Sequence, residues 1–175
     1  MDITSDNNVE RPCHRALGLS RRLDVLANSA SRVSREPAFE LTSGQLNLIH
    51  ETHVTGTLRY WLGADHNFRE QHSGCVINVA LISSFVGLPK VVAYSTATNA
   101  VIGLSPGLAN KWAKHDIRTN AIVQGFIPTD FNRTRIQNAD HRRILEHNPM
   151  GRCGAVEEIT NTAIFLASLA VSFVH

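Results

Sequence analysis

The first residues that could do chemistry are two histidines in the run His50-Glu51-Thr52-His53. Imidazoles three residues apart on a helix can share a face, but the zinc-protease spacing His-Glu-x-x-His is not met and no third ligand lies nearby. Three cysteines, Cys13, Cys75 and Cys153, are far apart and form no Cys-x-x-Cys pair. The sequence therefore predicts no metal site, and it predicts reduced thiols in a cytoplasmic protein.

A second possible chemistry is the binding of a dinucleotide phosphate. Such sites need closely spaced glycines that let the backbone approach the pyrophosphate at a helix N-terminus. The 175 residues contain no Gly-x-x-x-Gly-x-Gly run. We therefore expect that this chain by itself does not hold a nicotinamide dinucleotide.

Composition limits the remaining classes of function. The chain has 175 residues, is 43% hydrophobic, and carries a net charge of +2 with its basic residues scattered. A nucleic-acid-binding protein would show a basic face or stripe, so no nucleic-acid partner is predicted. The most apolar stretch, residues 163–174, is too short to cross a bilayer, so no membrane association is predicted. One domain over residues 1–175 is expected.

The elements that must position these residues alternate between short apolar runs and longer amphipathic ones, which is typical of βα units around a parallel sheet. Buried strands are predicted at residues 23–27, 75–80 and 118–123. Helices are predicted at 42–69, with Thr42 or Ser43 as the cap, and at 93–114. Two further helical stretches are predicted at 133–147 and 156–168.

The helix predicted at 93–114 contains a proline followed by glycine. Pro106 removes a backbone donor and clashes with the preceding turn at a cost of about 3 kcal/mol. Gly107 adds about 1 kcal/mol relative to alanine. A kink or a break is expected at this point.

Several segments, taken in order, resemble the short-chain dehydrogenase/reductase family over nearly the whole chain. They correspond to the family's third to sixth strands, its Tyr-x-x-x-Lys helix and its Pro-x-Gly-Arg and Glu-Glu patterns. The matching segments are Asp2-Ile3-Thr4, residues 23–31, Val54-Thr55-Gly56-Thr57, residues 76–79, Tyr94-Ser95-Thr96-Ala97, residues 117–122, residues 125–129, Pro149-Met150-Gly151-Arg152, Gly154 and Glu157-Glu158-Ile159. The branch most resembled is that of the gluconate and sugar-acid dehydrogenases.

This resemblance implies an α/β fold, a partial Rossmann-like, doubly wound parallel sheet. Strands 4, 5 and 6 of the family would be present side by side, while the first βαβ unit and the last strand would be lacking. Strands meant for the middle of a sheet would then present unpaired edges, which tend to aggregate or recruit partners.

The resemblance also implies a cofactor, NAD or NADP, and positions that would meet it. Asp2 falls where the family's aspartate contacts adenine, and Asn28 opens the turn that in the family reads Asn-Asn-Ala-Gly. Ile127 and Thr129 lie in the loop after the sixth strand. Because a neighbouring first strand is not seen, Asp2 is expected to be a solvated acid and the Ile127–Thr129 loop a simple turn. The charges of Arg32 and Arg35 are expected to be solvated.

The family's reaction uses a tyrosine as acid/base, a lysine that lowers its pKa, a serine that orients the substrate oxygen and an asparagine. By resemblance Tyr94 occupies the tyrosine position. Thr98 occupies the lysine position, Leu81 the serine position and His53 the asparagine position. Ser83 could replace the serine only if the chain register shifted.

These replacements have a physical consequence for Tyr94. Threonine carries no charge, so the phenol lacks the neighbour that would favour its ionised form. A tyrosine with an ordinary pKa of about 10 is roughly 0.1% ionised at pH 7. Proton transfer by such a group is poorly matched to neutral pH.

Three interpretations of function follow. The chain is a degenerate and truncated member of an NAD(P)-dependent oxidoreductase lineage, a pseudoenzyme without independent catalysis. Alternatively it is a non-catalytic interaction protein that pairs with a full-length family member, or with itself, through exposed sheet edges and helices 42–69 and 93–114. The third interpretation is an oxidoreductase whose missing half comes from another chain.

Overall fold

The computed structural model describes residues 3–129, 132, 146 and 148–175, and its centre is a parallel sheet of three strands. The strands are β1 (Val25–Asn28), β2 (Gly74–Leu81) and β3 (Ile117–Gln124), in the order β1-β2-β3. Val25 pairs with Cys75, and Gly74 pairs with Ile117. The predicted fold class and the order of the three strands are confirmed.

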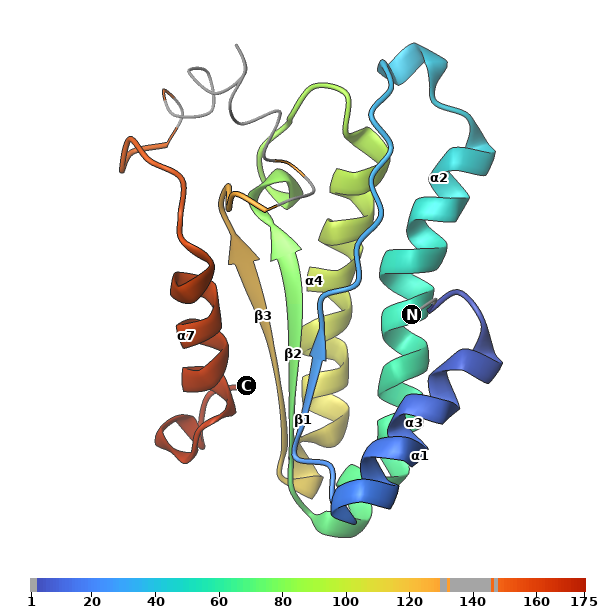
Figure 1. Cartoon of the computed structure of the whole chain (residues 1–175), viewed down its shortest axis with the longest axis vertical. Coiled ribbons are helices and arrows are strands. Elements are labelled where there is room, and N and C mark those ends of the chain that lie inside the picture. The colour runs from blue at the N-terminus through green and yellow to red at the C-terminus, as the bar shows by residue number, and fades with distance from the viewer. Residues whose placement is uncertain (1–2, 130–131, 133–145, 147) are drawn as a thin grey trace.

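Helices cover both faces of this sheet, as Figure 1 shows. On one face lie α3 (Gly56–Gln71) and α4 (Val92–Trp112), with α2 (Ser43–His50) beside α4 and α1 (Asp6–Ser20) against α3. On the other face lies α7 (Val156–Ala167). Short 3-10 turns connect these elements at Ala38–Glu40, Ile82–Ser84, Ala113–His115 and Leu169–Val171.

The core divides into two layers because successive strand residues point to opposite faces. Val76 packs with Trp61, Phe68 and Trp112 beneath α3 and α4. Its neighbours in the strand, Cys75 and Ile77, pack under α7 with Ile122. Burial on both sides explains why β2 is apolar almost throughout.

The first strand begins two residues later than predicted. Leu23 does not enter the sheet, because the side chain of Gln71 occupies its backbone groups. Gln71 Oε1 accepts a hydrogen bond from Leu23 N at 3.1 Å, and Gln71 Nε2 donates to Leu23 O at 2.6 Å.

The helix predicted at 42–69 is one helical rod containing α2, a π-helical turn over Glu51–Thr55, and α3. Thr42 is the cap: its Oγ1 accepts from Gln45 N at 3.2 Å, and its own N donates to Gln45 Oε1 at 2.8 Å. This reciprocal pair satisfies two of the backbone donors that a helix start leaves open.

Of the kink or break expected at Pro106, the break does not occur, since α4 runs without interruption from Val92 to Trp112. The proline is exposed, while Val101, Ser105 and Ala109 around it are buried. Burial of this face offsets the cost of the missing backbone hydrogen bond, which is about 3 kcal/mol.

The sequence analysis assigned no element to the segment that forms α1. Proline inside a helix is unfavourable, and Pro12 lies inside this one. The helix is held by packing: Cys13 contacts a buried cluster with Ile3 and Tyr60. Ile3 and Thr4 form no strand. Ile3 instead packs onto Gly56, where an added Cβ would approach Ile3 Cδ1 to 2.6 Å.

The helix predicted at 156–168 is confirmed as α7. The helix predicted at 133–147 lies almost wholly outside the described residues. Within the part of the chain that the structure describes, no helix is both long and apolar enough to cross a membrane.

The buried amide of Asn78 on β2 connects three neighbouring elements. Its Oδ1 accepts from Asn28 Nδ2 at 2.9 Å and from Trp61 Nε1 at 3.2 Å, and its Nδ2 donates to Ser105 Oγ at 3.0 Å. Asn78 and Trp61 are fully buried. Ser105 also donates to Val101 O at 3.0 Å, and Asn28 is only half-buried. Trp61 is therefore the group that depends most on Asn78.

We predict that Asn78→Leu lowers the free energy of unfolding by about 1 to 3 kcal/mol, because it leaves the indole N–H of Trp61 buried without an acceptor. Urea denaturation followed by circular dichroism measures the loss. In a Trp61→Phe background, which has no indole N–H, the same substitution should cost clearly less. Equal losses in the two backgrounds would contradict this role of Asn78.

Candidate functional site

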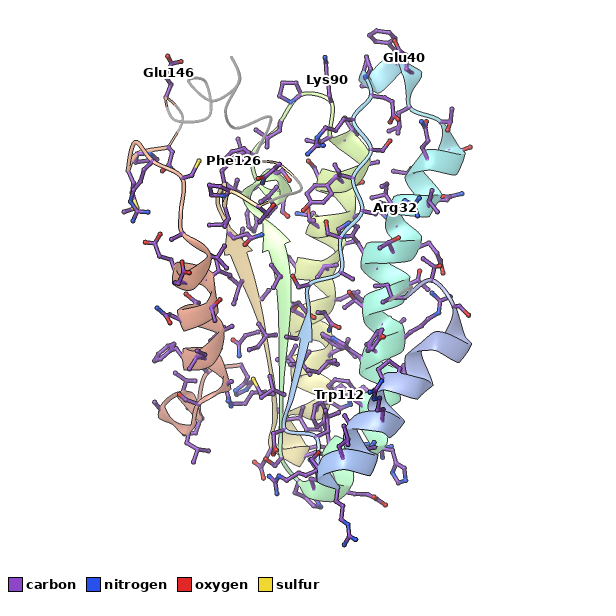
Figure 2. All side chains as sticks on the ribbon, viewed as in Figure 1. Arg32, Glu40, Lys90, Trp112, Phe126 and Glu146 are labelled. Carbon is purple, nitrogen blue, oxygen red and sulfur yellow. The ribbon has the colours of Figure 1, made fainter. Side chains whose placement is uncertain are left out.

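The candidate site lies where the strands end. In Figure 2, Arg32, Lys90 and Phe126 lie beyond the carboxyl ends of the strands, and Trp112 lies at the opposite end. Ligands of open parallel α/β sheets bind outside the carboxyl ends of the strands. The positions assigned by resemblance come from the loop after β1, the turn after β2, the first turns of α4 and the π-helical turn before α3.

Tyr94 and His53 are brought together by this arrangement. Their rings meet edge to face, with centroids 5.1 Å apart and planes at 88°. Tyr94 lies in the first turn of α4, and His53 lies in the π-helical turn. Wide π-turns inside α-helices are frequent at functional sites. The sequence predictions for the tyrosine and asparagine positions therefore fall in one place.

His53 is 4% exposed, and its imidazole fixes the loop after β1. Its Nε2 lies 2.8 Å from Arg32 O and 3.0 Å from Arg32 N. Nε2 donates to the carbonyl in one tautomer and accepts from the amide N–H in the other. Burial lowers the pKa of His53, with a smaller contribution from His50 in the same direction, while the hydrogen bond to Arg32 opposes them. At neutral pH the ring is uncharged.

The phenol of Tyr94 has a raised pKa, and the main cause is burial. A hydrogen bond from Ser31 and the charge of Arg35 act in the opposite direction and are smaller. From the sequence, Arg35 was expected to be a solvated loop charge, and no role was predicted for Ser31. Both act on Tyr94 because the loop after β1 passes over it, which no local sequence signal shows.

Thr98 is predicted to occupy the position of the family's lysine. Its side chain carries no charge and makes no hydrogen bond to the phenol of Tyr94. Its side chain is 1% exposed, and its Oγ1 donates to Tyr94 O at 3.0 Å and to Ser95 O at 3.1 Å. These are backbone carbonyls of its own helix, a common arrangement for threonine. The hydroxyl is thus used within α4.

The serine position offers no donor at the end of β2. Leu81 is the last residue of the strand and pairs with Gln124. Ser83 lies two residues later in the 3-10 turn and is 3% exposed. Its Oγ has no hydrogen-bond partner, and the buried hydroxyls of Ser84 and Ser95 also have none. No hydrogen bond therefore joins Ser83 to Tyr94.

The positions assigned to a nicotinamide cofactor are engaged within the protein. The amide of Asn28 donates to Asn78, and the side chain of Ser31 lowers the pKa of Tyr94 against the larger effect of burial. Ile127 is buried against Gly154, where an added Cβ would lie 2.5 Å from Ile127 Cδ1. Thr129 is exposed, and its N donates to Asn132 Oδ1 at 2.8 Å. Asp2 lies outside the described residues.

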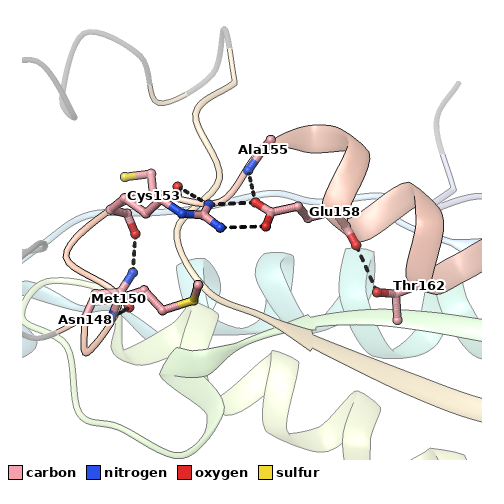
Figure 3. Close-up of polar contacts among 7 residues, drawn as sticks. Asn148, Met150, Cys153, Ala155, Glu158 and Thr162 are labelled. Carbon is pink, nitrogen blue, oxygen red and sulfur yellow. Dashed lines mark hydrogen bonds and ion pairs between the residues drawn. The ribbon is translucent and has the colours of Figure 1, made fainter.

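The segment that leads into α7 is fixed by an ion pair, shown in Figure 3. Arg152 binds both carboxylate oxygens of Glu158, at 2.8 and 2.7 Å, and Glu158 Oε2 also accepts from Ala155 N at 2.7 Å. The hydrogen bonds from Arg152 are the largest cause that lowers the pKa of Glu158 to about 2. The sequence resemblance pointed to these residues by their spacing, and the structure shows that they cap the helix.

The same segment contains a tight turn before Arg152. Asn148 Oδ1 accepts from Met150 N at 3.1 Å, and the amide nitrogen of Asn148 donates to Arg152 O. Gly151 takes the left-handed backbone conformation, with φ 62°. Among the described residues, no group of three or more histidine, cysteine or carboxylate side chains could hold a metal ion.

Comparison with known proteins identifies the family of the chain. The profile of a family described as enoyl-(acyl carrier protein) reductase matches residues 1–175. The chain is 34% identical over 158 residues to the 2-dehydro-3-deoxy-D-gluconate 5-dehydrogenase of Dickeya dadantii, covering 88% of this chain and 62% of that protein. It is 30% identical to the Escherichia coli protein of the same name, covering 99% and 70%. The chain thus spans about two thirds of the length of these relatives.

Solved structures show the same fold. A putative gluconate dehydrogenase from Agrobacterium tumefaciens superposes with a TM-score of 0.94 at 26% identity, covering 100% of this chain and 70% of that one. A gluconate 5-dehydrogenase from Burkholderia cenocepacia, solved with NADP and tartrate, gives 0.93 at 25% identity, covering 100% and 69%. On the profile match, the relatives and the fold together, the chain belongs to the short-chain dehydrogenase/reductase family, in the part of it that resembles gluconate dehydrogenases.

Proposed function

We propose that this chain, a member of an NAD(P)-dependent oxidoreductase lineage, does not catalyse hydride transfer by itself. The observation that carries the proposal is Thr98. It stands where the family places the lysine that lowers the tyrosine pKa, and its hydroxyl is bound to backbone carbonyls of its own helix.

The presence of Thr98 in place of a lysine matters because it affects the ionisation of Tyr94. Burial raises the pKa of the phenol, and Ser31 and Arg35 only reduce that effect. Even at its ordinary pKa of about 10, a tyrosine is only about 0.1% ionised at pH 7. A general acid/base works best with a pKa near the working pH. The site therefore lacks the tuned proton carrier that the family's reaction uses.

The substrate side of the site supports the same proposal. Leu81 offers no hydrogen bond to a hydroxyl or carbonyl oxygen. Ser83 is buried in the following turn without a bond to Tyr94. A substrate oxygen placed at Tyr94 would lack the donor that orients it.

The cofactor positions do not fit a bound dinucleotide in their present form. Two solved relatives contain NADP, which makes NAD or NADP the expected cofactor class of the lineage. In this chain Asn28 and Ser31 are engaged with protein groups, and the 175 residues contain no glycine-rich phosphate loop. We propose that neither nucleotide is held by this chain alone, and that the protein is cytoplasmic, as its three free cysteines favour.

A second candidate function is pairing with a full-length family member or with a second copy. Among the described residues, β1 pairs with β2 only, so its other edge carries no strand. Leu48 on α2 is 43% exposed and Leu62 on α3 is 60% exposed. An open strand edge beside exposed leucines favours association.

The first prediction concerns the proton affinity of Tyr94. We expect Thr98→Lys to lower the Tyr94 pKa by about 1 to 3, because a nearby cation favours the phenolate. The chain has two tyrosines, so a Tyr60→Phe background leaves one phenol, and its ultraviolet absorbance reports its titration.

The control for this titration is Asn110→Lys, which adds the same charge to an exposed position about three turns beyond position 98 along α4. This control should leave the Tyr94 pKa unchanged. Circular dichroism checks that each variant stays folded through the titration. An unchanged pKa in a folded Thr98→Lys variant would contradict the assignment of position 98.

The second prediction concerns the cofactor. Purified chain titrated with NADPH and with NADH should show no saturable binding by calorimetry or nucleotide fluorescence. The Burkholderia cenocepacia relative, solved with NADP, serves as the positive control for NADPH. Micromolar binding of either nucleotide by this chain would overturn the proposal.

The third prediction tests pairing. If the second candidate is right, mixing the chain with the full-length Escherichia coli relative should give a heterocomplex in size-exclusion chromatography. Leu62→Lys should weaken this complex, whereas Asn161→Lys, at an exposed position of α7 on the other face of the sheet, should not. Separate elution of the two proteins would exclude pairing with that relative.

A further inference from the structure

Two histidines lie together at the opposite end of the sheet from the candidate site. The ring centroids of His72 and His115 are 6.0 Å apart, with their planes inclined by 49°. His115 follows Trp112 by three residues, and Figure 2 shows Trp112 at the end away from Arg32 and Phe126.

The register of the sheet places these two residues side by side. Gly74 begins β2, Ile117 begins β3, and the two are partners in the parallel ladder. His72 and His115 each stand two residues before these strand starts. Equivalent positions in neighbouring parallel strands lie about 4.8 Å apart in the backbone. The register of the sheet therefore brings the two turns that carry these histidines next to each other.

The turns that carry the pair are also well defined. His72 caps α3 in the left-handed conformation, with φ 47°, and its N donates to Arg69 O. His115 ends the 3-10 turn Ala113–His115, and Asp116 after it is left-handed, with φ 56°. His72 is exposed and His115 is half-buried, so both rings are accessible from solvent.

From these observations we propose that His72 and His115 form a two-imidazole site for a divalent transition metal of the Zn²⁺ class. Imidazole nitrogen is a preferred ligand of zinc, with a bond of about 2.0 to 2.1 Å. Two imidazoles on one tetrahedral ion then have centroids about 5 Å apart. The observed pair needs to close by about 1 Å, which rotation of the exposed His72 side chain supplies. Water fills the other two coordination positions.

The chain has seven other histidines and three cysteines that can compete for the metal, and the cysteines and one of these histidines are controlled as follows. Burial raises the pKa of the Cys13 and Cys75 thiols, which keeps them protonated. Cys153 is partly exposed, so Cys153→Ser is used as the background for every variant. His66 lies on α3, six residues before the proposed ligand His72. It is exposed, and its Nε2 lies 3.6 Å from Glu70 Oε1. It provides a matched control histidine.

The test is calorimetric titration of the purified chain with Zn²⁺ at about pH 7.5, where unperturbed imidazole is neutral. One site is expected, and His72→Asn or His115→Gln should each weaken it by at least about tenfold, while His66→Gln leaves it unchanged. Asparagine is chosen at position 72 because it tolerates the left-handed conformation. In nuclear magnetic resonance spectra, the ring signals of both histidines should shift together.

The proposal is overturned if His72→Asn and His115→Gln bind Zn²⁺ as tightly as the Cys153→Ser chain does. It is also overturned if His66→Gln weakens binding as much as they do, since that result indicates scattered binding by surface histidines. Circular dichroism of each variant confirms that a loss of affinity is not a loss of fold.

Discussion

The structure depends on the position of β2 in the middle of a parallel sheet. It also depends on the buried polar side chain of Asn78 in that strand. Asn78 links β1 through Asn28, α3 through Trp61 and α4 through Ser105. Apolar packing around it is not directional, whereas these hydrogen bonds accept one arrangement of the three elements. The distances between the loop after β1, the first turn of α4 and the turn before α3 follow from that arrangement. The Tyr94–His53 contact is one result.

The chain retains the fold of the family, and the proposed loss of catalysis rests on the electrostatics of this site. A buried phenol is favoured in its neutral form unless a cation stands beside it. In this chain the cation position holds Thr98, whose hydroxyl is bound inside the helix. His53 is neutral and holds the loop at Arg32. Under the proposed function, the aromatic and backbone contacts at Tyr94 and His53 serve as packing.

The sequence predicted the fold class, the three strands and the helices around them, because apolar runs and periodicity report burial directly. It missed α1, whose stability comes from Cys13 packing against residues distant in sequence. It allowed a break at Pro106, as the alternative to a kink, because the buried face that holds α4 together is not visible in a local sequence pattern. At the site, resemblance assigned Tyr94, Thr98, Leu81 and His53 to their positions. It could not show that Ser31 and Arg35 lower the pKa of Tyr94, because the course of a loop relative to a helix is part of the tertiary structure.

The π-helical turn at Glu51–Thr55 has a consequence for the whole rod that contains it. At about 100° per residue, a regular helix would place Trp61 about 120° and Phe68 about 100° around from Ile49. A wide turn accommodates one surplus residue, and removing that residue from the count brings the two to within about 20° of Ile49. The buried residues of α2 and α3 then form one continuous stripe along the rod. The surplus residue, which would otherwise rotate the buried residues of α3 by about 100° relative to Ile49, is thereby accommodated within the π-helical turn.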